Sequence, residues 1–525
     1  MNRIFPFLLT AFLMVALSVA CNKEDKSLVA QLKAQKEELE GNVSEISGAE
    51  DVASSDFSIT LDRDCYWVDA AGSVKVHYTL AQPAALEAVT QAGWNATVAP
   101  AGEKEGDITI TAPDPASPGI LTLKATAPGG ATAESFVQIF VRKPYGNVQS
   151  PIIEALAYNG FYSNLATEEN YRKLAEAGIT IITVEGDWDG WQPQTRLAEA
   201  FGVKIVLFVN YHGGLYADDP ENYKGLDELI NEAKQYPAIC AYQIADEPHT
   251  GIAYRLAAAK SRIEELDPDH PVYINLHPSS VSPAGMGATT YEEYVEYFAN
   301  VCNLKFITFD QYPLYIWGIE DCWYRSLKTV YDSSRKRGIP FWAFIQSCRE
   351  WTRVDPTLET MRLQGNINLA YGAQCNQYFV WKATSGTDYA PIMDSGEYKP
   401  VYYDVKEYNR EMHNREFVFA KCDARKIRHI GYNYYIHGTG FTTADLPEAI
   451  SDLSADDCAL VSFIGNSGNE YVVVCNKAYD KKLNVDATFT RTVYTIDREG
   501  EFTEQAPGAA RFTIDEGDML VIKWK

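Results

Sequence analysis

Residues 241–249, AYQIADEPH, join a short apolar run to two adjacent carboxylates, Asp246 and Glu247. The apolar run predicts a buried strand that ends where the charged side chains begin. Packing alone does not favour two acidic residues at the end of a buried strand, because a buried charge without a partner is costly. In barrel enzymes the carboxyl ends of the strands carry the chemistry. We therefore take this stretch as the centre of a functional site.

Seven further apolar runs of strand length occur in the central part of the chain. The eight candidate strands are residues 152–157, 179–184, 203–209, 239–244, 272–276, 306–309, 341–345 and 378–381. Amphipathic helical patterns lie between them, for example over residues 168–178, where Gly178 marks a helix end. This alternation predicts parallel pairing in a (β/α)8 barrel over residues 144–415. An open doubly wound sheet is the alternative, although the first candidate strand is not followed by the glycine-rich loop of dinucleotide sites.

Period-two alternation on both sides of the predicted barrel indicates β-rich modules. Residues 56–143 contain short alternating runs separated by turns rich in glycine and proline, and they resemble an immunoglobulin-like β-sandwich. Residues 416–525 show the same alternation and predict a second β-sandwich. The expected fold class is therefore multidomain, with an α/β barrel flanked by two β-sandwiches.

The first residues predict export. Residues 1–20 combine a basic start at Arg3 with an apolar body, which is the build of a secretory signal. The ending LSVAC, residues 17–21, resembles a bacterial lipobox, which implies lipidation of Cys21 and an outer-membrane lipid as partner. A transmembrane helix is the alternative, but the apolar stretch is short for a span. The resemblance implies a Gram-negative outer-membrane lipoprotein at the cell surface, with the periplasmic face as the alternative.

A tether is predicted over residues 21–55. Apolar residues recur there at intervals of three, four and seven between Leu28 and Ile46, with charged residues in between. This spacing predicts an amphipathic helix or a short coiled coil. We interpret the segment as a spacer, with weak oligomerisation through residues 28–46 as a further expectation.

Charge and composition exclude some partners and favour others. The formal net charge of −25 and the absence of basic runs argue against nucleic acid and sulfated glycans, which require clusters of Lys and Arg. The ten cysteines form no CxxC pair, so a structural zinc site is not expected. The 33 Tyr and 10 Trp suit a protein that offers flat amphipathic surfaces to sugars or peptides, although β-rich domains use the same residues for packing.

Carboxylates, amides, histidines and aromatic residues follow the predicted strands. They include Glu185, Trp188, Asn210, His212, Asp246, Glu247, His249, His277, Asp310, Tyr312, Gln346, Glu350 and Trp381. Because the carboxyl ends of parallel strands share one mouth of a barrel, these side chains are expected to converge. Planar polar groups with flat rings suit a neutral polyhydroxylated ligand.

The ending Asp246-Glu247-Pro248 of the fourth candidate strand resembles the Asn-Glu-Pro ending of clan A retaining glycoside hydrolases. Trp381, after the eighth strand, is similar to the aromatic floor of their sugar site. The resemblance covers residues 150–415 and implies that Glu247 protonates the glycosidic oxygen and then activates water, with no cofactor. The negative charge of Asp246 is expected to raise the proton affinity of Glu247. Adjacent residues of an extended strand point to opposite sides, so only one of the two is expected to face the substrate.

The seventh candidate strand departs from the family pattern, because it ends in Gln346 where the family has a nucleophilic Glu. An amide cannot form a glycosyl ester. We expect another carboxylate to be the catalytic partner, with Asp310 first, Glu185 second and Glu350 third. A carboxyl separation of about 5–5.5 Å would permit retention, and one of about 6.5–9.5 Å would favour inversion.

Three other interpretations remain open. The substrate itself, through an acetamido group, is one alternative nucleophile, with Asp246 or Asp310 assisting. A non-catalytic glycan-binding lipoprotein with a degenerate barrel is the second. A metal site built from His212, His249 and His277 with Asp310 is the third. The residues expected to bind substrate are Asp246, Asn210, His212, His277, Tyr312, Gln346, Trp381 and Trp188.

Overall fold

The structure is a computed structural model. It describes residues 57–525 except 64, 100–101, 117–118, 142–149, 163, 187–189, 210–223, 321, 385 and 432–439. The predicted signal, the lipidation at Cys21 and the helical tether over residues 28–46 lie outside these residues, as do Trp188, Asn210 and His212. No helix of the described part is both long enough and apolar enough to span a bilayer.

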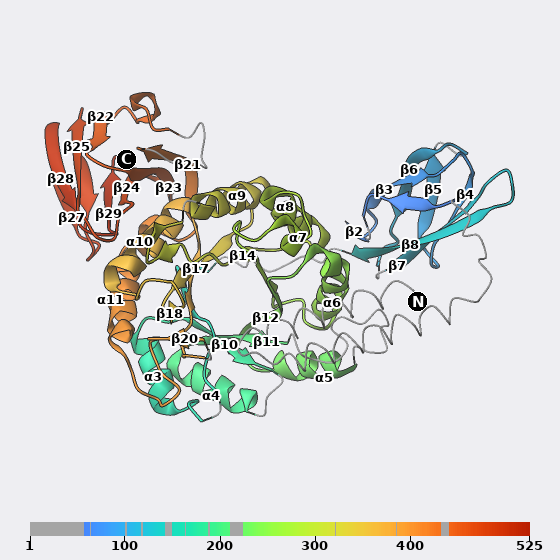
Figure 1. The fold of residues 1–525 in the computed structure, drawn as a ribbon, viewed down its shortest axis with the longest axis horizontal. Coiled ribbons are helices and arrows are strands. Elements are labelled where there is room, and N and C mark those ends of the chain that lie inside the picture. The colour runs from blue at the N-terminus through green and yellow to red at the C-terminus, as the bar shows by residue number, and fades with distance from the viewer. Residues whose placement is uncertain are drawn as a thin grey trace, which may run out of the picture.

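A closed barrel of eight parallel strands forms the centre of the molecule (Figure 1), which confirms the predicted barrel and excludes the open sheet. The strands are β9 (Glu154–Ala157), β10 (Ile181–Glu185), β11 (Lys204–Phe208), β12 (Ile239–Asp246), β13 (Val272–Leu276), β14 (Ile307–Phe309), β17 (Phe341–Gln346) and β19 (Cys375–Phe379). They follow one another round the barrel in this order, and β19 pairs with β9 to close it.

The eighth strand lies earlier in the chain than we expected. The apolar run at residues 378–381 predicted it, but β19 begins at Cys375 and ends at Phe379. Its first half is polar because Gln377 points to the barrel interior, where its amide donates to Thr308 at 2.8 Å. Asn376 is also buried, and its Oδ1 accepts a hydrogen bond from Asn368 at 3.1 Å. Buried polar groups with partners thus replace the apolar side chains that the pattern requires.

Helices surround the barrel in Figure 1. They are α3 (Glu168–Glu176), α4 (Trp191–Phe201), α5 (Lys224–Ala233), α6 (Ala253–Leu266), α7 (Pro283–Met286), α8 (Tyr291–Val301), α9 (Cys322–Arg337), α10 (Leu358–Tyr371), α11 (Pro400–Asn414) and α12 (Glu416–Phe419). Their ends follow capping rules: Thr167 accepts a hydrogen bond from the Asn170 N–H at the start of α3, and Thr290 and Glu293 form a capping box on α8.

Two four-stranded sheets with one shared core precede the barrel. One has the order β1 (Ile59–Leu61), β3 (Ser73–Leu80), β6 (Glu105–Thr111), β5 (Asn95–Ala99), and the other β2 (Cys65–Val68), β8 (Thr132–Val141), β7 (Gly119–Thr126), β4 (Ala85–Val89). We call them the amino-terminal sheet pair. All their pairings are antiparallel except that of β2 with β8. Trp67 fastens the pair to the barrel, because its indole N–H donates to the Val301 carbonyl at 2.6 Å.

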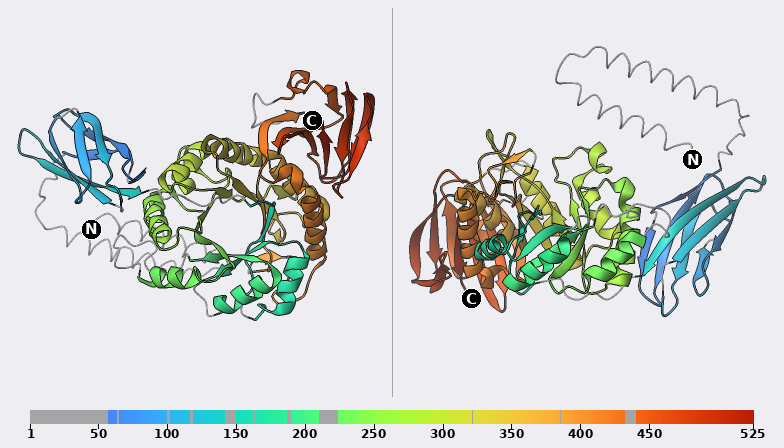
Figure 2. Two further views of the ribbon diagram at one scale, coloured as in Figure 1. Left: turned by 180° about the vertical axis from the view of Figure 1, so that it is seen from behind. Right: turned by 90° about the horizontal axis from the view of Figure 1, so that it is seen from below.

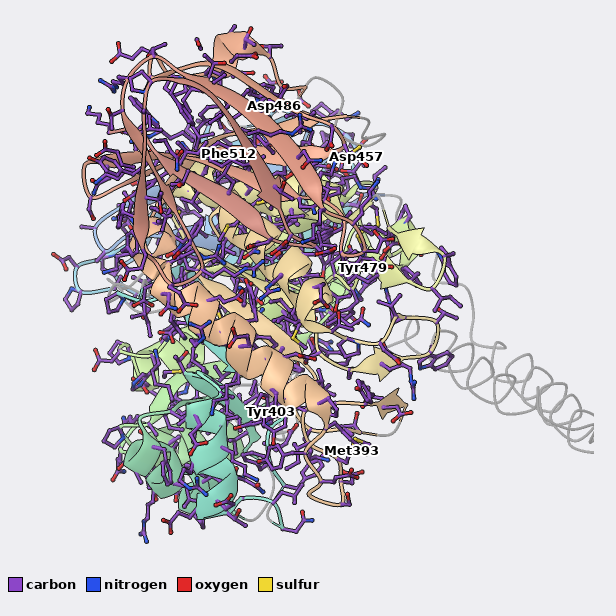
Figure 3. All side chains as sticks on the ribbon, turned by 90° about the vertical axis from the view of Figure 1, so that its left-hand side faces the viewer. Met393, Tyr403, Asp457, Tyr479, Asp486 and Phe512 are labelled. Atoms are coloured by element: carbon purple, nitrogen blue, oxygen red, sulfur yellow. The ribbon has the colours of Figure 1, made fainter. Side chains whose placement is uncertain are left out.

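Two further sheets, the carboxyl-terminal sheet pair, follow the barrel. The larger has the order β21 (Asp423–Ile430), β23 (Ala459–Asn466), β24 (Asn469–Asn476), β29 (Met519–Lys523), β26 (Val493–Ile496), β27 (Phe502–Gln505). The smaller has the order β22 (Ile450–Ala455), β25 (Leu483–Phe489), β28 (Gly508–Ile514). Figures 2 and 3 show them on the opposite side of the barrel from the amino-terminal pair and beside α11, which carries Tyr403.

The larger carboxyl-terminal sheet covers the outer side of α10. Ser462 donates a hydrogen bond to the Ala370 carbonyl at 2.6 Å, and the Asn366 amide donates to the Gly517 carbonyl at 3.0 Å. Every residue of α10 from Thr360 to Tyr371 is therefore buried, although the sequence includes Gln364, Asn366 and Asn368.

Candidate active site

A cavity of about 300 Å³ lies where the barrel strands end. It is lined by Tyr158, Asp246, Glu247, Asn275, Pro278, Ser280, Asp310, Gln311, Tyr312, Phe344, Glu350, Arg353 and Phe379. Four of these side chains are carboxylates and one is a guanidinium, so the lining is acidic. Aromatic rings, two amides, Pro278 and Ser280 supply the rest of the wall.

Asp246 and Glu247 both line the cavity, so the expectation that only one of them faces it is wrong. β12 ends at Asp246, and Glu247 adopts a left-handed conformation with φ of 47°. That conformation interrupts the alternation of side chains that a continued strand would impose. The Glu247 N–H still donates to the Asn275 carbonyl at 2.9 Å, which fixes the turn against β13. Such strain in a non-glycine residue is typical of functional sites.

Glu247 contacts two groups that act on its charge. Its Oε1 lies 3.4 Å from Nδ1 of His277, and its side chain is 40% exposed. Burial by the cavity wall acts to raise the pKa of Glu247, but the nearby His277 and the carboxyl group of Asp310 outweigh it and lower the pKa. These interactions favour the ionised form of Glu247.

Asp310 follows β14 and is only 8% exposed. Burial, and next the negative charges of Glu247 and Asp246, raise the pKa of Asp310 well above its ordinary value. The hydrogen bond to Glu247 acts in the same direction, because the protonated Asp310 donates it. Two carboxyl groups in contact share one proton for the same electrostatic reason.

Polar side chains inside the barrel orient Asp246. The Asn275 amide donates to its Oδ1 at 2.9 Å, and Gln243 donates to the Tyr158 hydroxyl at 2.7 Å. The Tyr158 hydroxyl in turn forms a hydrogen bond with Asp246. Burial raises the pKa of Asp246, and the charge of Glu247 adds to this despite the opposing hydrogen bonds from Asn275 and Tyr158. Asp246 is thus held in one orientation with its carboxylate toward the cavity.

The seventh strand contributes Phe344 to the cavity, and the loop after it contributes charged side chains. Gln346, the last residue of β17, is buried, and its amide donates to the carbonyls of Val354 at 2.8 Å and Cys348 at 3.2 Å. The cavity is lined instead by Glu350 and Arg353 from the segment that these bonds hold. Gln346 therefore holds the loop in place and is not itself part of the lining.

The other candidate residues fall into three groups. Tyr312 and His277 lie at the site, Tyr312 in the lining and His277 against Glu247. Glu185 ends β10 but is not part of the lining, and Trp381 is fully buried beyond β19, packed edge-on against Tyr402 with ring centroids 6.1 Å apart. The positions of Trp188, Asn210 and His212 lie outside the described residues.

The metal hypothesis gains nothing from His249. Its Nδ1 accepts a hydrogen bond from the Gly251 N–H at 2.9 Å and caps the short helix η2 (Thr250–Ile252). In the described part of the chain, no three His, Cys, Asp or Glu side chains are grouped so as to hold a metal ion.

Sequence reasoning missed four residues of the lining that bear on binding. Asn275 lies inside the apolar run of β13, and Phe344 lies in β17. Phe379 ends the displaced strand β19, and Arg353 lies in a loop. A polar residue within an otherwise apolar strand was a usable signal for Asn275, whereas the sequence offers no comparable signal for Arg353.

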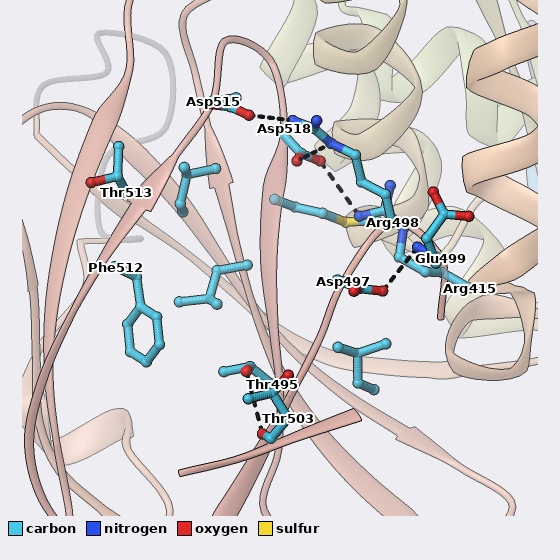
Figure 4. A pocket seen from close by; sticks show the side chains of 14 residues that line it. Arg415, Thr495, Asp497, Arg498, Glu499, Thr503, Phe512, Thr513, Asp515 and Asp518 are labelled. Carbon is cyan, nitrogen blue, oxygen red and sulfur yellow. Dashed lines mark hydrogen bonds and ion pairs between the residues drawn. The ribbon is translucent and has the colours of Figure 1, made fainter. Parts of the chain in front are cut away.

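A larger cavity of about 430 Å³ lies in the carboxyl-terminal sheet pair (Figure 4). Several of its charged side chains are paired with one another: Arg498 contacts Asp518 at 2.8 Å and Asp515 at 2.7 Å, and Arg415 contacts Asp518 at 3.4 Å. These groups hold the sheets to α11 and its end, so the smaller cavity at the barrel mouth is the candidate active site.

No family model and no curated protein matches the chain. Solved structures to which it is similar include a GH128 endo-β-1,3-glucanase from Sorangium cellulosum, with 13% identity over 48% of this chain and 97% of that one and a TM-score of 0.33. A Bacteroides ovatus GH5 xyloglucanase has 12% identity over 66% and 98%, with a TM-score of 0.30. The GH99 endo-α-mannosidase from Bacteroides thetaiotaomicron has 14% identity over 47% and 79%, with a TM-score of 0.34.

Proposed function

We propose that this chain is a glycoside hydrolase that cleaves glycosidic bonds in a neutral glycan. The observation that carries the proposal is the cavity at the barrel mouth, in which Glu247 and Asp310 stand together in the lining with Asp246 and Glu350. Burial and the neighbouring negative charges raise the pKa of Asp310, so this pair holds a proton more firmly than isolated carboxyl groups do, and acid catalysis of glycosidic cleavage requires such a proton. The acidic lining excludes polyanionic glycans because like charges would be brought together.

Glu247 is the member of the pair that acts on the substrate. It is the more exposed of the two, while Asp310 is buried beneath it. The raised pKa of Asp310 and the lowered pKa of Glu247 favour the proton on Asp310 before a sugar binds. A sugar bound against Glu247 removes water from its carboxylate, which raises its proton affinity and draws the proton across the hydrogen bond. Glu247 then protonates the glycosidic oxygen and afterwards takes a proton from the attacking water.

Glu350 is the second catalytic carboxylate in this proposal. Carboxyl groups that are hydrogen-bonded to each other are closer than the about 5–5.5 Å needed for a nucleophile and an acid on opposite sides of the bond. Asp310 therefore serves Glu247 rather than the anomeric carbon. Glu350 lines the same cavity from the seventh strand end, three strands round the barrel from β12. It takes the role that the amide of Gln346 cannot perform.

An acetamido group of the substrate is the second candidate for the nucleophile. It is favoured by the fixed orientation of Asp246, whose carboxylate is held by Asn275 and Tyr158 and faces the cavity. In that mechanism Asp246 accepts a hydrogen bond from the acetamido N–H and Glu350 has no chemical role.

The test is a reducing-end assay on a panel of neutral and N-acetylated glycans with wild-type protein, Glu247→Gln, Glu350→Gln and Asp246→Asn. We expect wild type to release reducing ends and Glu247→Gln to lose this activity. Equal turnover by both would contradict the role of Glu247. Binding without cleavage by every protein in the series would identify a glycan-binding protein with a degenerate barrel.

We also propose that the chain is an outer-membrane lipoprotein anchored through Cys21, at the cell surface or, alternatively, at the periplasmic face. The lipobox-like residues 17–21 support this proposal. Metabolic labelling with a fatty-acid analogue, compared between wild type and Cys21→Ser, tests the anchor. Accessibility of the labelled protein to an external protease tests which face it occupies.

A further inference from the structure

A protruding hairpin stands next to the cavity. It consists of β15 (Leu314–Tyr315) and β16 (Gly318–Ile319), and its turn carries Ile316 and Trp317, each 70% exposed. The hairpin is joined to the loop after β17, because the Ile316 N–H donates to the Thr352 carbonyl at 3.0 Å. Hairpin and loop therefore form one surface at the barrel mouth.

A stack of side chains leads from the cavity wall to this hairpin. The guanidinium of Arg353 lies 5.8 Å from the ring centroid of Tyr312 and 3.8 Å from that of Tyr315. Tyr315 stacks on Trp317 with centroids 4.7 Å apart and an interplanar angle of 16°. We call these four side chains the aromatic ladder. Since Tyr312 and Arg353 line the cavity, the ladder is continuous with it.

Trp351 adds a second exposed ring beside the same cavity. It follows Glu350 directly, is 86% exposed and has a left-handed backbone with φ of 50°. Its loop is fixed, because Arg349 forms ion pairs with Asp388 at 2.6 Å and Asp355 at 3.1 Å. The indole of Trp351 therefore lies in solvent on a loop that the ion pairs of Arg349 stabilise.

The exposure of these rings is not explained by folding. Burying a large apolar side chain stabilises a fold, and these side chains forgo that contribution. Trp317 and Trp351 are the exposed tryptophans among the described residues, and both adjoin the one cavity that holds the carboxylate pair. Exposed apolar surface that adjoins a binding cavity is typical of an interaction site.

We propose that the aromatic ladder and Trp351 bind sugar units of a glycan chain that extends out of the cavity. This inference rests on the proposed function. It narrows the substrate of the proposed hydrolase to glycan chains that are longer than the cavity can enclose. A cavity of about 300 Å³ is at the lower limit for small-ligand sites, so most of a chain must lie outside it. Flat rings offer their faces to the C–H faces of sugars, and Trp317 and Trp351 are exposed enough to do so, at 70% and 86%.

The experiment compares wild type with Trp317→Ala, Trp351→Ala and the double variant. Phe136→Ala is the matched control, since Phe136 is 63% exposed but belongs to β8 in the amino-terminal sheet pair. For the glycan that wild type cleaves, kcat/KM is measured on the polymer and on an aryl glycoside of the same sugar. We expect the ratio of polymer to aryl glycoside to fall about tenfold in each single variant, and further in the double variant. Phe136→Ala should match wild type.

Affinity gel electrophoresis with the same polymers in a Glu247→Gln background separates the inference from the proposed function. If wild type cleaves nothing, the hydrolase proposal fails, and retarded migration that is lost in the tryptophan variants still supports the ladder as a glycan site. If the tryptophan variants retain both the cleavage ratio and the retardation of the parent protein, the inference is overturned. The exposed rings would then belong to a surface for a protein partner.

Discussion

The fourth and the seventh strand of the barrel end in opposite ways. β12 ends in two carboxylates that line the cavity, one of them in a left-handed conformation. β17 ends in a buried amide, Gln346, which donates to two carbonyls of the following loop. The end of β12 therefore places its own carboxylates in the cavity lining. The end of β17 instead positions a loop, and that loop carries the carboxylate of Glu350.

The largest effect is expected at the fourth strand. Glu247→Gln keeps the shape of the side chain but cannot transfer the proton, so kcat should fall by about 10³-fold or more. The measurement is reducing-end release from the best glycan of the panel. Glu87→Gln, at an exposed position of β4, is the control and should leave kcat unchanged. A Glu247→Gln variant with wild-type kcat would remove the fourth strand from the chemistry.

The seventh strand should show the next largest effect, through its loop. Glu350→Gln is expected to lower kcat by about a hundredfold or more, because the anomeric carbon loses its nucleophile or base. Added azide should restore turnover and yield a glycosyl azide if Glu350 is a nucleophile. If kcat is unchanged in Glu350→Gln but falls in Asp246→Asn, the nucleophile is the acetamido group of the substrate. The seventh strand and its loop would then have a structural role only.

Asp310 is expected to set how the activity depends on pH. Burial raises its pKa, so the proton that it shares with Glu247 is retained to a pH above the ordinary carboxyl range. In Asp310→Asn, Glu247 must hold the proton alone, and the alkaline limb of the kcat profile should move to lower pH. Activity at neutral pH should fall by about 10- to 100-fold. A profile identical to that of wild type would show that Asp310 does not supply the proton.

The same group makes stability depend on pH. Because the folded pKa of Asp310 is raised, its contribution to the free energy of unfolding is complete below its ordinary pKa and is lost as pH rises through the folded value. The melting temperature of wild type should therefore fall more steeply with rising pH than that of Asp310→Asn. Scanning calorimetry across this range measures the difference, and parallel curves would contradict it.

The smallest effect on activity is expected at Gln346. Gln346→Glu restores a carboxylate at the strand end, but that group would be buried beside two carbonyls to which it cannot donate when ionised. The variant should lose about 1–3 kcal/mol of stability and less than tenfold in kcat. Urea denaturation measures the first and the reducing-end assay the second. A gain in activity would show that Gln346 faces the substrate.

The barrel could be predicted because each strand is a short apolar run followed by a helical pattern. Asp246, Glu247, Asp310 and Tyr312 could be placed in one cavity because strand ends share a mouth. The joint orientation of the acidic pair could not be predicted, since it depends on the left-handed backbone at Glu247. Strand periodicity carries no information about such a turn.

The contact between Glu247 and Asp310 could not be predicted from the sequence either. The same holds for Glu350 as the proposed second catalytic carboxylate. Both depend on side-chain distances across the barrel, and Glu350 is brought to the cavity by a loop whose path Gln346 fixes. The eighth strand was displaced in our prediction because Asn376 and Gln377 form buried hydrogen bonds. A pattern of apolar residues does not reveal such partners.

The complete burial of α10 has a consequence for the order of synthesis. The helix is translated well before β29, which occupies an inner position of the sheet that covers α10. While the last sheet strands are still on the ribosome, the outer side of α10 therefore lacks the cover that they give it in the folded protein. Proteolytic cleavage of the chain just before α12 would remove the carboxyl-terminal sheets and expose the same side of α10. We expect the exposed surface to bind chaperones or to promote aggregation.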